Sequence, residues 1–245
     1  MSMSVSGVSV ELTDARALVA GATGALGGAI TAELAGRGAR VALAGRDPSR
    51  LAHAVRAYPG APAVRFDAYA PESCASAVRD ASAALGGLDA VVIAFGAVAF
   101  GAASEVGDEV AEHLMAVNHL APAAFCRAAL GILHPGASIA AVTGVVAERP
   151  QPRMADYSAS KAALSAWLDA VRREARSTGV RVLEIRPGHL DTGFAQRPVA
   201  GTAPPLPEGG DPRQLATAVA DALETGAELL RSGPDGTPVV ERRAR

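Results

Sequence analysis

The sequence predicts an α/β protein built on a single doubly wound parallel sheet with helices on both faces. Two observations carry this prediction. Short apolar runs of strand length alternate with helical segments along the chain, which predicts parallel strands joined by right-handed crossovers. One such run, Ala90 to Phe95, is apolar without interruption, as is typical of a parallel strand buried on both faces. The 245 residues contain no internal repeat and no boundary in composition, so we expect one domain over residues 1–245.

Each element follows from its local pattern. Six strands are expected, at Ala17 to Gly21, Arg40 to Ala44, Ala63 to Phe66, Ala90 to Phe95, Ser138 to Thr143 and Arg181 to Ile185. Helices are expected at Ala25 to Arg37, Pro48 to Tyr58, Pro71 to Leu85, Glu105 to Leu133 (which Pro122 can break) and Asp156 to Thr178. A last helix, Asp211 to Thr225, has an aspartate as N-cap, a proline at N1 and a glycine stop at Gly226.

Composition narrows the class of protein. The net charge of −2 gives no reason to expect a nucleic-acid partner, and no apolar run approaches the ~20 residues of a membrane span. Met1 to Gly7 lacks the features of an export signal, so we expect a cytoplasmic protein. Cys74 and Cys126 fall in helical stretches and are expected as buried free thiols. The five histidines are scattered, so no metal site is expected.

The first candidate for catalysis is the pair Tyr157 and Lys161. Their four-residue spacing on a predicted helix places both side chains on one face, one turn apart. A phenol has an unperturbed pKa of about 10, but an ammonium roughly 5 Å away, at an effective dielectric of about 20, favours the phenolate by about 3 kcal/mol. Such a tyrosine can act as an acid or base near neutral pH. Taken alone, the pair is equally consistent with a packed tyrosine and a solvated lysine.

A glycine-rich turn joins the first predicted strand to the first predicted helix, with glycines at Gly21, Gly24 and Gly27. Glycines here permit a tight turn and let a pyrophosphate approach the helix N-terminus. The spacing differs from GxGxxG, and a plain tight turn would also explain it. Its position after a buried strand and before a helix favours nucleotide binding.

The end of the second predicted strand should select the cofactor. An acidic residue there would bind the ribose 2′-hydroxyl of NAD, whereas an arginine would accommodate the 2′-phosphate of NADP. Because the sequence is Ala44-Gly45-Arg46-Asp47, we take Gly45 as the discriminating position and Arg46 as the phosphate partner. NADP(H) is therefore expected over NAD(H). Asp47 is better explained as the N-cap of the next helix.

Over roughly Ala15 to Thr192, these motifs in this order resemble the short-chain dehydrogenase/reductase family. The resemblance implies a Rossmann-like fold and hydride transfer between a nicotinamide and a carbonyl or alcohol. It implies that Tyr157 is the general acid/base, that Lys161 lowers its pKa, and that Asn118, otherwise an ordinary packed amide, holds a proton-relay water. The implied cofactor-binding residues are Gly21, Thr23, Gly24, Leu26, Gly27, Arg46, Asp67 (adenine), Gly96, Lys161 (ribose), Pro187, Gly188 and Thr192 (carboxamide).

Two departures concern the cofactor and the sheet. The fourth strand ends in Ile93-Ala94-Phe95-Gly96 where the family has Asn-Asn-Ala-Gly, so we expect looser binding of the adenosine ribose. The glycine loop has the form GxxGxxG. The family's closing strand, with its glycine pair, is not expected after Gly226, which removes the tetramer contact that this strand often makes.

A third departure concerns catalysis, because Gly144 occupies the position of the family's serine. Thr143 offers a hydroxyl one residue earlier, but neighbouring side chains on a strand point to opposite faces. It can serve only if the strand has ended or a bulge shifts its register. Two alternatives therefore stay open. Either Thr143 is the catalytic surrogate for the serine, or the site works without this hydroxyl or takes one from the substrate.

Three functions remain open. The chain is expected to be an NADP-dependent reductase or dehydrogenase; the alternatives are a non-redox enzyme of this fold (cyclase, dehydratase or epimerase) and a catalytically weak dinucleotide-binding sensor. Retention of Asn118, Tyr157 and Lys161 argues against the sensor.

The substrate loop, residues 193–212, is rich in proline and glycine and is either a lid, which we favour, or a linker. The resemblance also implies a homodimer or higher homo-oligomer, because the family commonly pairs the helix after Tyr157 and the Asn118 helix across a two-fold axis. Small residues beside Trp167 on the first of these helices fit such a contact, or else only face the sheet: Ala159, Ala162, Ala163 and Ala166.

Overall fold

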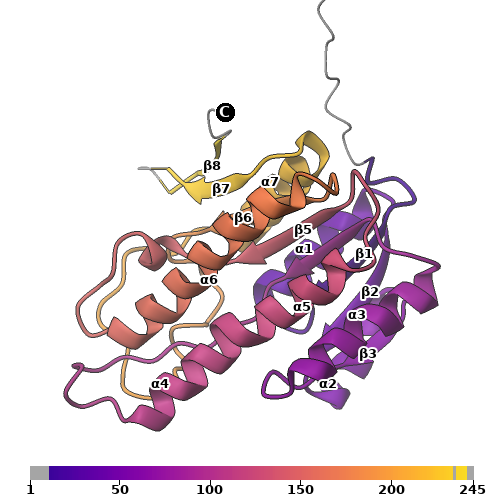
Figure 1. Cartoon of the computed structure of the whole chain (residues 1–245). Coiled ribbons are helices and arrows are strands. Elements are labelled where there is room, and N and C mark those ends of the chain that lie inside the picture. The colour runs from indigo at the N-terminus through magenta and orange to yellow at the C-terminus, as the bar shows by residue number, and fades with distance from the viewer. Residues whose placement is uncertain (1–10, 234–235, 242–245) are drawn as a thin grey trace, which may run out of the picture.

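All eight strands of the computed structural model, which describes residues 11–233 and 236–241, join one sheet in the order β3-β2-β1-β4-β5-β6-β7-β8 (Figure 1). Strands β1 to β7 run parallel, and β8 runs antiparallel to β7. The strands are β1 (Arg16–Ala20), β2 (Arg40–Gly45), β3 (Ala63–Arg65), β4 (Ala90–Ile93), β5 (Ser138–Val142), β6 (Arg181–Arg186), β7 (Leu229–Ser232) and β8 (Pro238–Glu241). The predicted fold class is confirmed.

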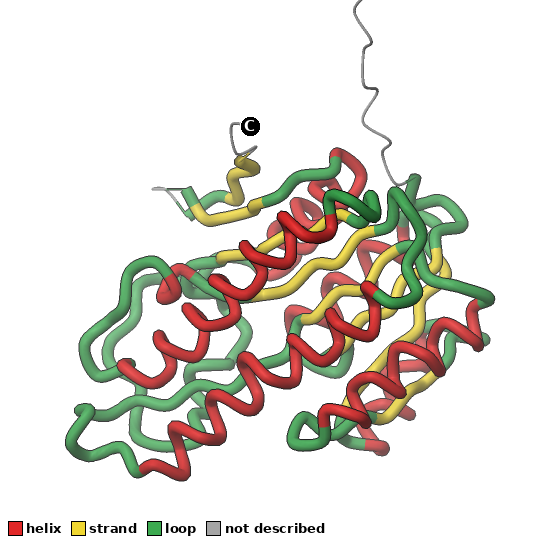
Figure 2. Tube along the Cα trace, viewed as in Figure 1, coloured by secondary structure: helices red, strands yellow, loops and turns green. Residues whose placement is uncertain are grey.

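Helices cover both faces of the sheet (Figure 2). The α-helices are α1 (Ala25–Gly36), α2 (Pro48–Ala54), α3 (Pro71–Leu85), α4 (Asp108–Met115), α5 (Ala121–Leu130), α6 (Ala155–Ala175) and α7 (Pro212–Thr225). Along β1, Leu18 and Ala20 pack with α3, α5 and α6, whereas Ala17 and Val19 pack with α1 and α7. This alternation follows from the strand's two-residue period, and it is why the buried strands are apolar throughout.

The strand order places a crevice between β1 and β4. From β1 the chain builds outward first to β2 and β3, then returns to add β4, β5 and β6 on the other side. At such a reversal the loops leaving the two neighbouring strands diverge, and ligands of open α/β sheets bind outside the carboxyl ends there. Ala20 pairs with Ile93 at the ends of these two strands, so the crevice opens directly beyond them.

The long helix predicted from Glu105 to Leu133 is three segments. After α4, residues Ala116–Leu120 form a π-helical turn in which Ala121 N–H donates to Ala116 O, five residues earlier. The cause lies at Pro122, which has no N–H for the carbonyl of Asn118, four residues before it, and whose ring would clash with that carbonyl. The break therefore falls one turn earlier than the proline itself, at Asn118.

The prediction that no closing strand follows Gly226 was wrong. Leu229 and Leu230 are buried in β7, which pairs with β6 although it lacks the glycine pair, and β8 then covers β7. The free edge of β6 would otherwise expose unpaired backbone groups, which explains why a short apolar run is drawn into the sheet. Capping was predicted correctly at Asp47 and Asp211, whose side chains accept from backbone N–H groups of α2 and α7.

Candidate active site

The glycine-rich turn between β1 and α1 presents backbone, not side chains, to the crevice. A Cβ added at Gly27 would lie 2.2 Å from Gly21 O, and one at Gly21 would lie 2.9 Å from Ala94 C. Helix α1 starts after Gly24 with no side-chain cap and no acidic residue in its first turn. Uncapped amides at the positive end of a helix dipole favour an anion. The turn thus fits a dinucleotide pyrophosphate, with the predicted contacts at Gly21, Thr23, Gly24, Leu26 and Gly27.

Gly45, at the end of β2, is packed against Thr23 and Leu51. A Cβ at Gly45 would lie 3.1 Å from Thr23 Cγ2 and 3.5 Å from Leu51 Cδ1, so there is little room here for an acidic side chain, and glycine supplies none. Arg46 is exposed beside it. Arg50 donates to Thr23 O at 2.6 Å, which brings a second guanidinium to the same place. Sequence reasoning missed Arg50; the available signal was its one-turn spacing from Arg46 at a helix start.

Two further predicted cofactor residues follow the next strands. Asp67 lies exposed two residues beyond β3, and its Oδ1 accepts from Tyr69 N at 2.9 Å. Gly96 follows β4, where an added Cβ would lie 3.0 Å from Asn118 Oδ1 and 3.2 Å from Lys161 Nζ. Glycine at this position therefore lets the chain pass directly beside both side chains.

Tyr157 and Lys161 occupy the first turns of α6, as their spacing predicted. Lys161 is 3% exposed, and its Nζ donates to Val142 O at 3.1 Å. Burial lowers the pKa of Lys161 to about 8 and raises the pKa of Tyr157 above its ordinary value. The direction for Tyr157 is opposite to the predicted one, because the phenol is desolvated and its charged form is disfavoured. At pH 7 this pair is a neutral phenol beside a largely protonated amine.

Asn118 ties the loop after β4 to the helix that carries Tyr157. Its Oδ1 accepts from Ala97 N at 2.9 Å, and its Nδ2 donates to Ala97 O at 2.9 Å and to Ser160 Oγ at 3.0 Å. Ser160 in turn donates to Tyr157 O at 2.7 Å. The buried amide therefore fixes the loop beside Tyr157, and its predicted role in holding a relay water stays a prediction.

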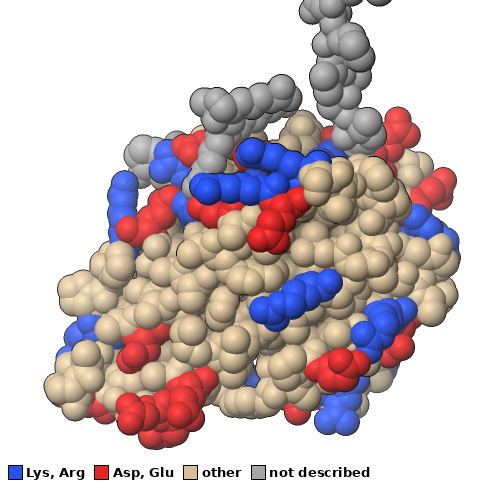
Figure 3. Space-filling view, viewed as in Figure 1, with Lys and Arg blue, Asp and Glu red and all other residues tan. Residues whose placement is uncertain are grey.

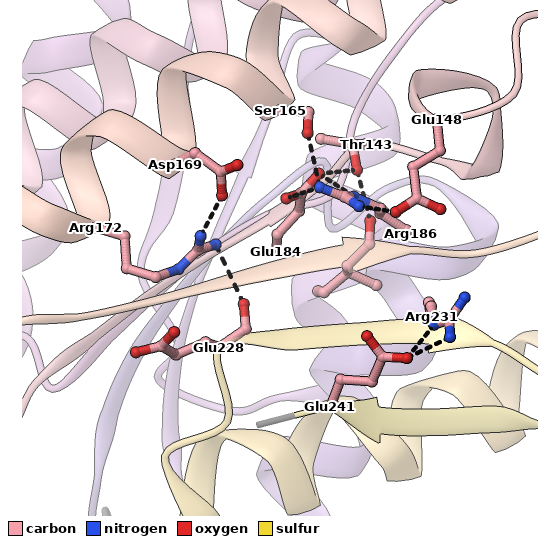
Figure 4. Close-up of polar contacts among 11 residues, drawn as sticks. Thr143, Glu148, Ser165, Asp169, Arg172, Glu184, Arg186, Glu228, Arg231 and Glu241 are labelled. Carbon is pink, nitrogen blue, oxygen red and sulfur yellow. Dashed lines mark hydrogen bonds and ion pairs between the residues drawn. The ribbon is translucent and has the colours of Figure 1, made fainter. Parts of the chain in front are cut away.

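The structure corrects the prediction for Thr143. Its hydroxyl donates to Glu184 Oε1 at 2.8 Å, and the two residues are 2% and 0% exposed (Figure 4). A carboxylate this deeply buried is stabilised only by the donors around it, and the Thr143 hydroxyl is one of them. The hydroxyl is committed to Glu184, so it is not the substrate donor. Gly144 supplies no replacement and has a φ of +140°, which side-chain-bearing residues rarely adopt.

Glu184 belongs to a polar cluster that sequence reasoning missed, in which four residues are buried and Glu148 is exposed at the edge: Thr143, Glu148, Ser165, Glu184 and Arg186 (Figure 4). Arg186 contacts both carboxylate oxygens of Glu184 at 2.6 and 2.8 Å, donates to Ser165 Oγ at 2.9 Å, and pairs with Glu148. The cluster joins the exits of β5 and β6 to α6. It therefore fixes the loop that carries Gly144 relative to α6.

The turn after β6 carries the predicted Pro187, Gly188 and Thr192. Gly188 N donates to Ser232 Oγ at 2.8 Å, a contact made by the strand that was not predicted. Arg197 donates to Thr192 O at 3.2 Å. The turn is thus held from both β7 and the substrate loop.

The substrate loop is bound to the loop after β4 and lies beside Tyr157. Val199 N donates to Val98 O at 2.8 Å, and Phe100 N donates to Ala200 O at 3.0 Å. The Phe194 ring centre lies 6.5 Å from that of Tyr157. Buried or half-buried apolar side chains pack with Tyr157 on this side: Val98, Phe100, Met154, Phe194, Ala195 and Leu206. Phe95 packs against the rings of Phe66 and Phe125.

Other predicted features can be placed briefly. Cys74 and Cys126 are buried free thiols, as predicted. Within residues 11–233 and 236–241, no three histidine, cysteine or acidic side chains gather as metal ligands would. In the same part of the chain, no helix has the length and apolar character needed to cross a membrane.

Known proteins match most of the chain. Residues 15–201 match the family model described as short chain dehydrogenase. An uncharacterized oxidoreductase of Staphylococcus saprophyticus is 32% identical over 225 residues, or 88% of this chain and 93% of that protein. A short chain dehydrogenase of Burkholderia cenocepacia, solved with NADP, is 28% identical with a TM-score of 0.78, covering 88% of this chain and 92% of that one. One of Burkholderia phymatum, solved with NAD, has a TM-score of 0.84 at 21% identity over 92% and 91%, and supports the fold alone.

Proposed function

This chain belongs to the short-chain dehydrogenase family of oxidoreductases, and from that premise we propose that it uses NADP(H) to interconvert a carbonyl compound and an alcohol. The observation that carries the cofactor assignment is that Gly45 has no acidic side chain while two arginines lie close to the glycine-rich turn. Arg50 donates to Thr23 O at 2.6 Å, and Arg46 follows Gly45 directly and is exposed. Two planar cations near a position without an acidic side chain favour a phosphate over a free hydroxyl.

Substitution of the arginines tests this assignment. Arg46→Ala and Arg50→Ala should each weaken NADPH binding about tenfold or more, as loss of a charge-assisted contact does, and leave NADH binding nearly unchanged. Arg56→Ala removes the same charge from an exposed position beyond α2 and serves as the control. Dissociation constants come from quenching of Trp167 fluorescence or from calorimetry. Equal losses for both dinucleotides, or a wild-type preference for NADH, would overturn the assignment.

The catalytic residues act as a proton-transfer unit. A bound nicotinamide supplies or accepts the hydride at the substrate carbon. In the reduction direction Tyr157, held neutral by burial, gives its proton to the carbonyl oxygen and becomes a phenolate. Lys161, with a pKa of about 8, stabilises that phenolate as a cation in a site where water is scarce and charges interact strongly.

The substrate is proposed to be an uncharged, mainly apolar carbonyl or alcohol compound. The side chains packed with Tyr157 on the lid side are apolar, among them Val98, Phe100 and Leu206. An ionised substrate group buried there would lack a partner and would cost several kcal/mol. A panel of aliphatic and aromatic ketones, compared with matched keto acids, tests this: faster turnover of the acids would contradict it.

Gly144 favours a second candidate. With no hydroxyl at this position and Thr143 bound to Glu184, Tyr157 is the single side-chain donor that we assign to the carbonyl oxygen. A non-redox enzyme, such as a dehydratase or epimerase, can use Tyr157 without that second donor. Absorbance of NADPH distinguishes the two, because the primary proposal requires its consumption with some carbonyl compound of the panel.

We also propose that two copies associate through the outer face of α5 and α6. A broad part of this face carries few charged side chains (Figure 3), and Leu120, directly before α5, is 47% exposed. Two of the four predicted α6 alanines, Ala159 and Ala166, are exposed rather than packed on the sheet, and Ala162 and Ala163 are half-buried. Exposed apolar patches of this kind mark interfaces. Light scattering should give at least a dimer at micromolar concentration, and Leu120→Arg should weaken it; a wild-type monomer would reject the proposal.

A further inference from the structure

Tyr69 and His113 make a contact that bridges two separate parts of the chain. The Tyr69 hydroxyl and His113 Nδ1 share a hydrogen bond, and the two ring centres are 5.7 Å apart. Tyr69 lies in the turn after β3, whereas His113 lies on α4, which follows β4. The contact therefore joins the turn after β3 to α4, across the crevice between β1 and β4.

The neighbours of this pair are the residues proposed to hold the adenosine half of the cofactor. The backbone N–H of Tyr69 donates to Asp67 Oδ1 at 2.9 Å, so the turn that carries Tyr69 is held beside the predicted adenine contact. On the other side, the charge of Arg46 acts on His113. Strands β2 and β3 lie on one side of the crevice between β1 and β4, and Tyr157 lies on the other. A dinucleotide with its pyrophosphate at the glycine-rich turn must therefore extend its adenosine half toward β2 and β3 and its nicotinamide half toward Tyr157. The Tyr69–His113 pair thus stands at the adenosine end.

We propose that Tyr69 and His113 form a clasp that closes over the adenosine end of the bound dinucleotide and slows its release. This inference rests on the proposed function, since it assumes that a nicotinamide dinucleotide occupies the crevice. The hydrogen bond with Asp67 holds only the backbone of Tyr69, and the residue is 63% exposed, so its ring can swing into solvent when the contact with His113 breaks. One hydrogen bond therefore governs whether the clasp is open or closed.

The chemistry of both rings suits this role. A phenol ring offers a flat face on which an adenine can stack, and base–aromatic stacking does not depend on the phosphate at the ribose. His113 is partly buried beside Leu114 on α4, and burial, then the charge of Arg46, lowers its pKa. A neutral imidazole can share a hydrogen bond with the phenol without bringing a second positive charge next to Arg46. The clasp can therefore close at neutral pH.

The rate of cofactor release tests the proposal. Stopped-flow displacement of NADPH and of NADH gives the dissociation rate constants for the wild type, Tyr69→Phe, Tyr69→Ala, His113→Leu and the double variant Tyr69→Phe/His113→Leu. Tyr69→Ala should raise the rate constant for both dinucleotides about tenfold, since it removes the ring as well as the hydrogen bond. Tyr69→Phe and His113→Leu should each raise it a few-fold. The double variant should do no more than either alone, because both break the same contact.

Controls separate the clasp from the proposed function. Tyr58→Phe alters a tyrosine on the other face of the sheet and should leave the rates unchanged. Single-turnover hydride transfer from prebound cofactor should be the same in all clasp variants. Rates of release equal to wild type would overturn the clasp while leaving the NADP(H) proposal intact. Faster release of NADPH alone would also overturn it, and would assign His113 to the 2′-phosphate. Absence of dinucleotide binding by the wild type would instead reject the proposed function itself.

Discussion

Replacing Thr143 by valine distinguishes a structural from a catalytic hydroxyl at the position where the family's serine is missing. The substitution keeps the shape of the side chain and removes the hydroxyl that donates to Glu184 at 2.8 Å. Thr143 is 2% exposed and Glu184 is 0% exposed, so water cannot replace the lost donor. A buried hydrogen bond to a charged group contributes about 1.5–3 kcal/mol. Glu184 keeps its two contacts with Arg186, so we expect a loss of about 2 kcal/mol rather than collapse of the cluster.

For a chain of this length, about 2 kcal/mol corresponds to a fall in Tm of about 4–8 °C, measured by calorimetry or circular dichroism. Turnover should change by less than about threefold, whereas loss of a donor to a developing oxyanion costs about a hundredfold or more. Thr31→Val is the matched control: Thr31 is 0% exposed, and its hydroxyl donates to a neutral carbonyl, Gly27 O, at 2.7 Å. It should lower stability by only about 1 kcal/mol.

The reasoning would be refuted by the reverse pattern in Thr143→Val, with an unchanged Tm and a hundredfold loss in kcat. That result would mean that the hydroxyl turns from Glu184 to the substrate.

Gly144→Ser gives a second test. The φ of +140° at this position should make the serine strain the backbone, so the variant should be less stable and should not reduce carbonyls faster. A clear gain in kcat would show that the natural site is limited by the missing donor.

Other outcomes follow from the same geometry. Tyr157→Phe should abolish turnover and leave the Kd for NADPH nearly unchanged, whereas Lys161→Met should damage both; activity in Tyr157→Phe would remove it as the acid/base. His134 makes hydrogen bonds with Pro135 O and with Asp89, and these raise the pKa of the imidazole above its ordinary 6.5. The protonated imidazole therefore stabilises the fold fully below pH 6.5, and this stabilisation is lost as the pH rises through the raised pKa. Urea unfolding of His134→Gln and wild type should therefore converge above neutral pH, and a difference that grows with pH would contradict this sign.

Much of the fold could be predicted because its signals are local. Whether a stretch forms a strand or a helix depends on the period of its apolar residues, and the caps at Asp47 and Asp211 depend on the next two or three residues. The same holds for the spacing of Tyr157 and Lys161 on one helix face and for the glycines before α1. The sequence alone therefore determined the fold class, the family, and which strand ends carry the candidate site.

The tertiary structure decided what depends on residues far apart in the chain. The partner of Thr143 is 41 positions away, and that of Tyr69 is 44 positions away, so neither contact has a signature in the local pattern. Arg50 reaches the glycine-rich turn only because α2 lies close to the start of α1 in the folded chain. Strand β7 has weak strand character by itself and forms because its short apolar run pairs with the open edge of β6. Side-chain direction and long-range pairing are set by packing against neighbours that the sequence does not place side by side, and this is why burial, rather than spacing, decided the pKa of Tyr157.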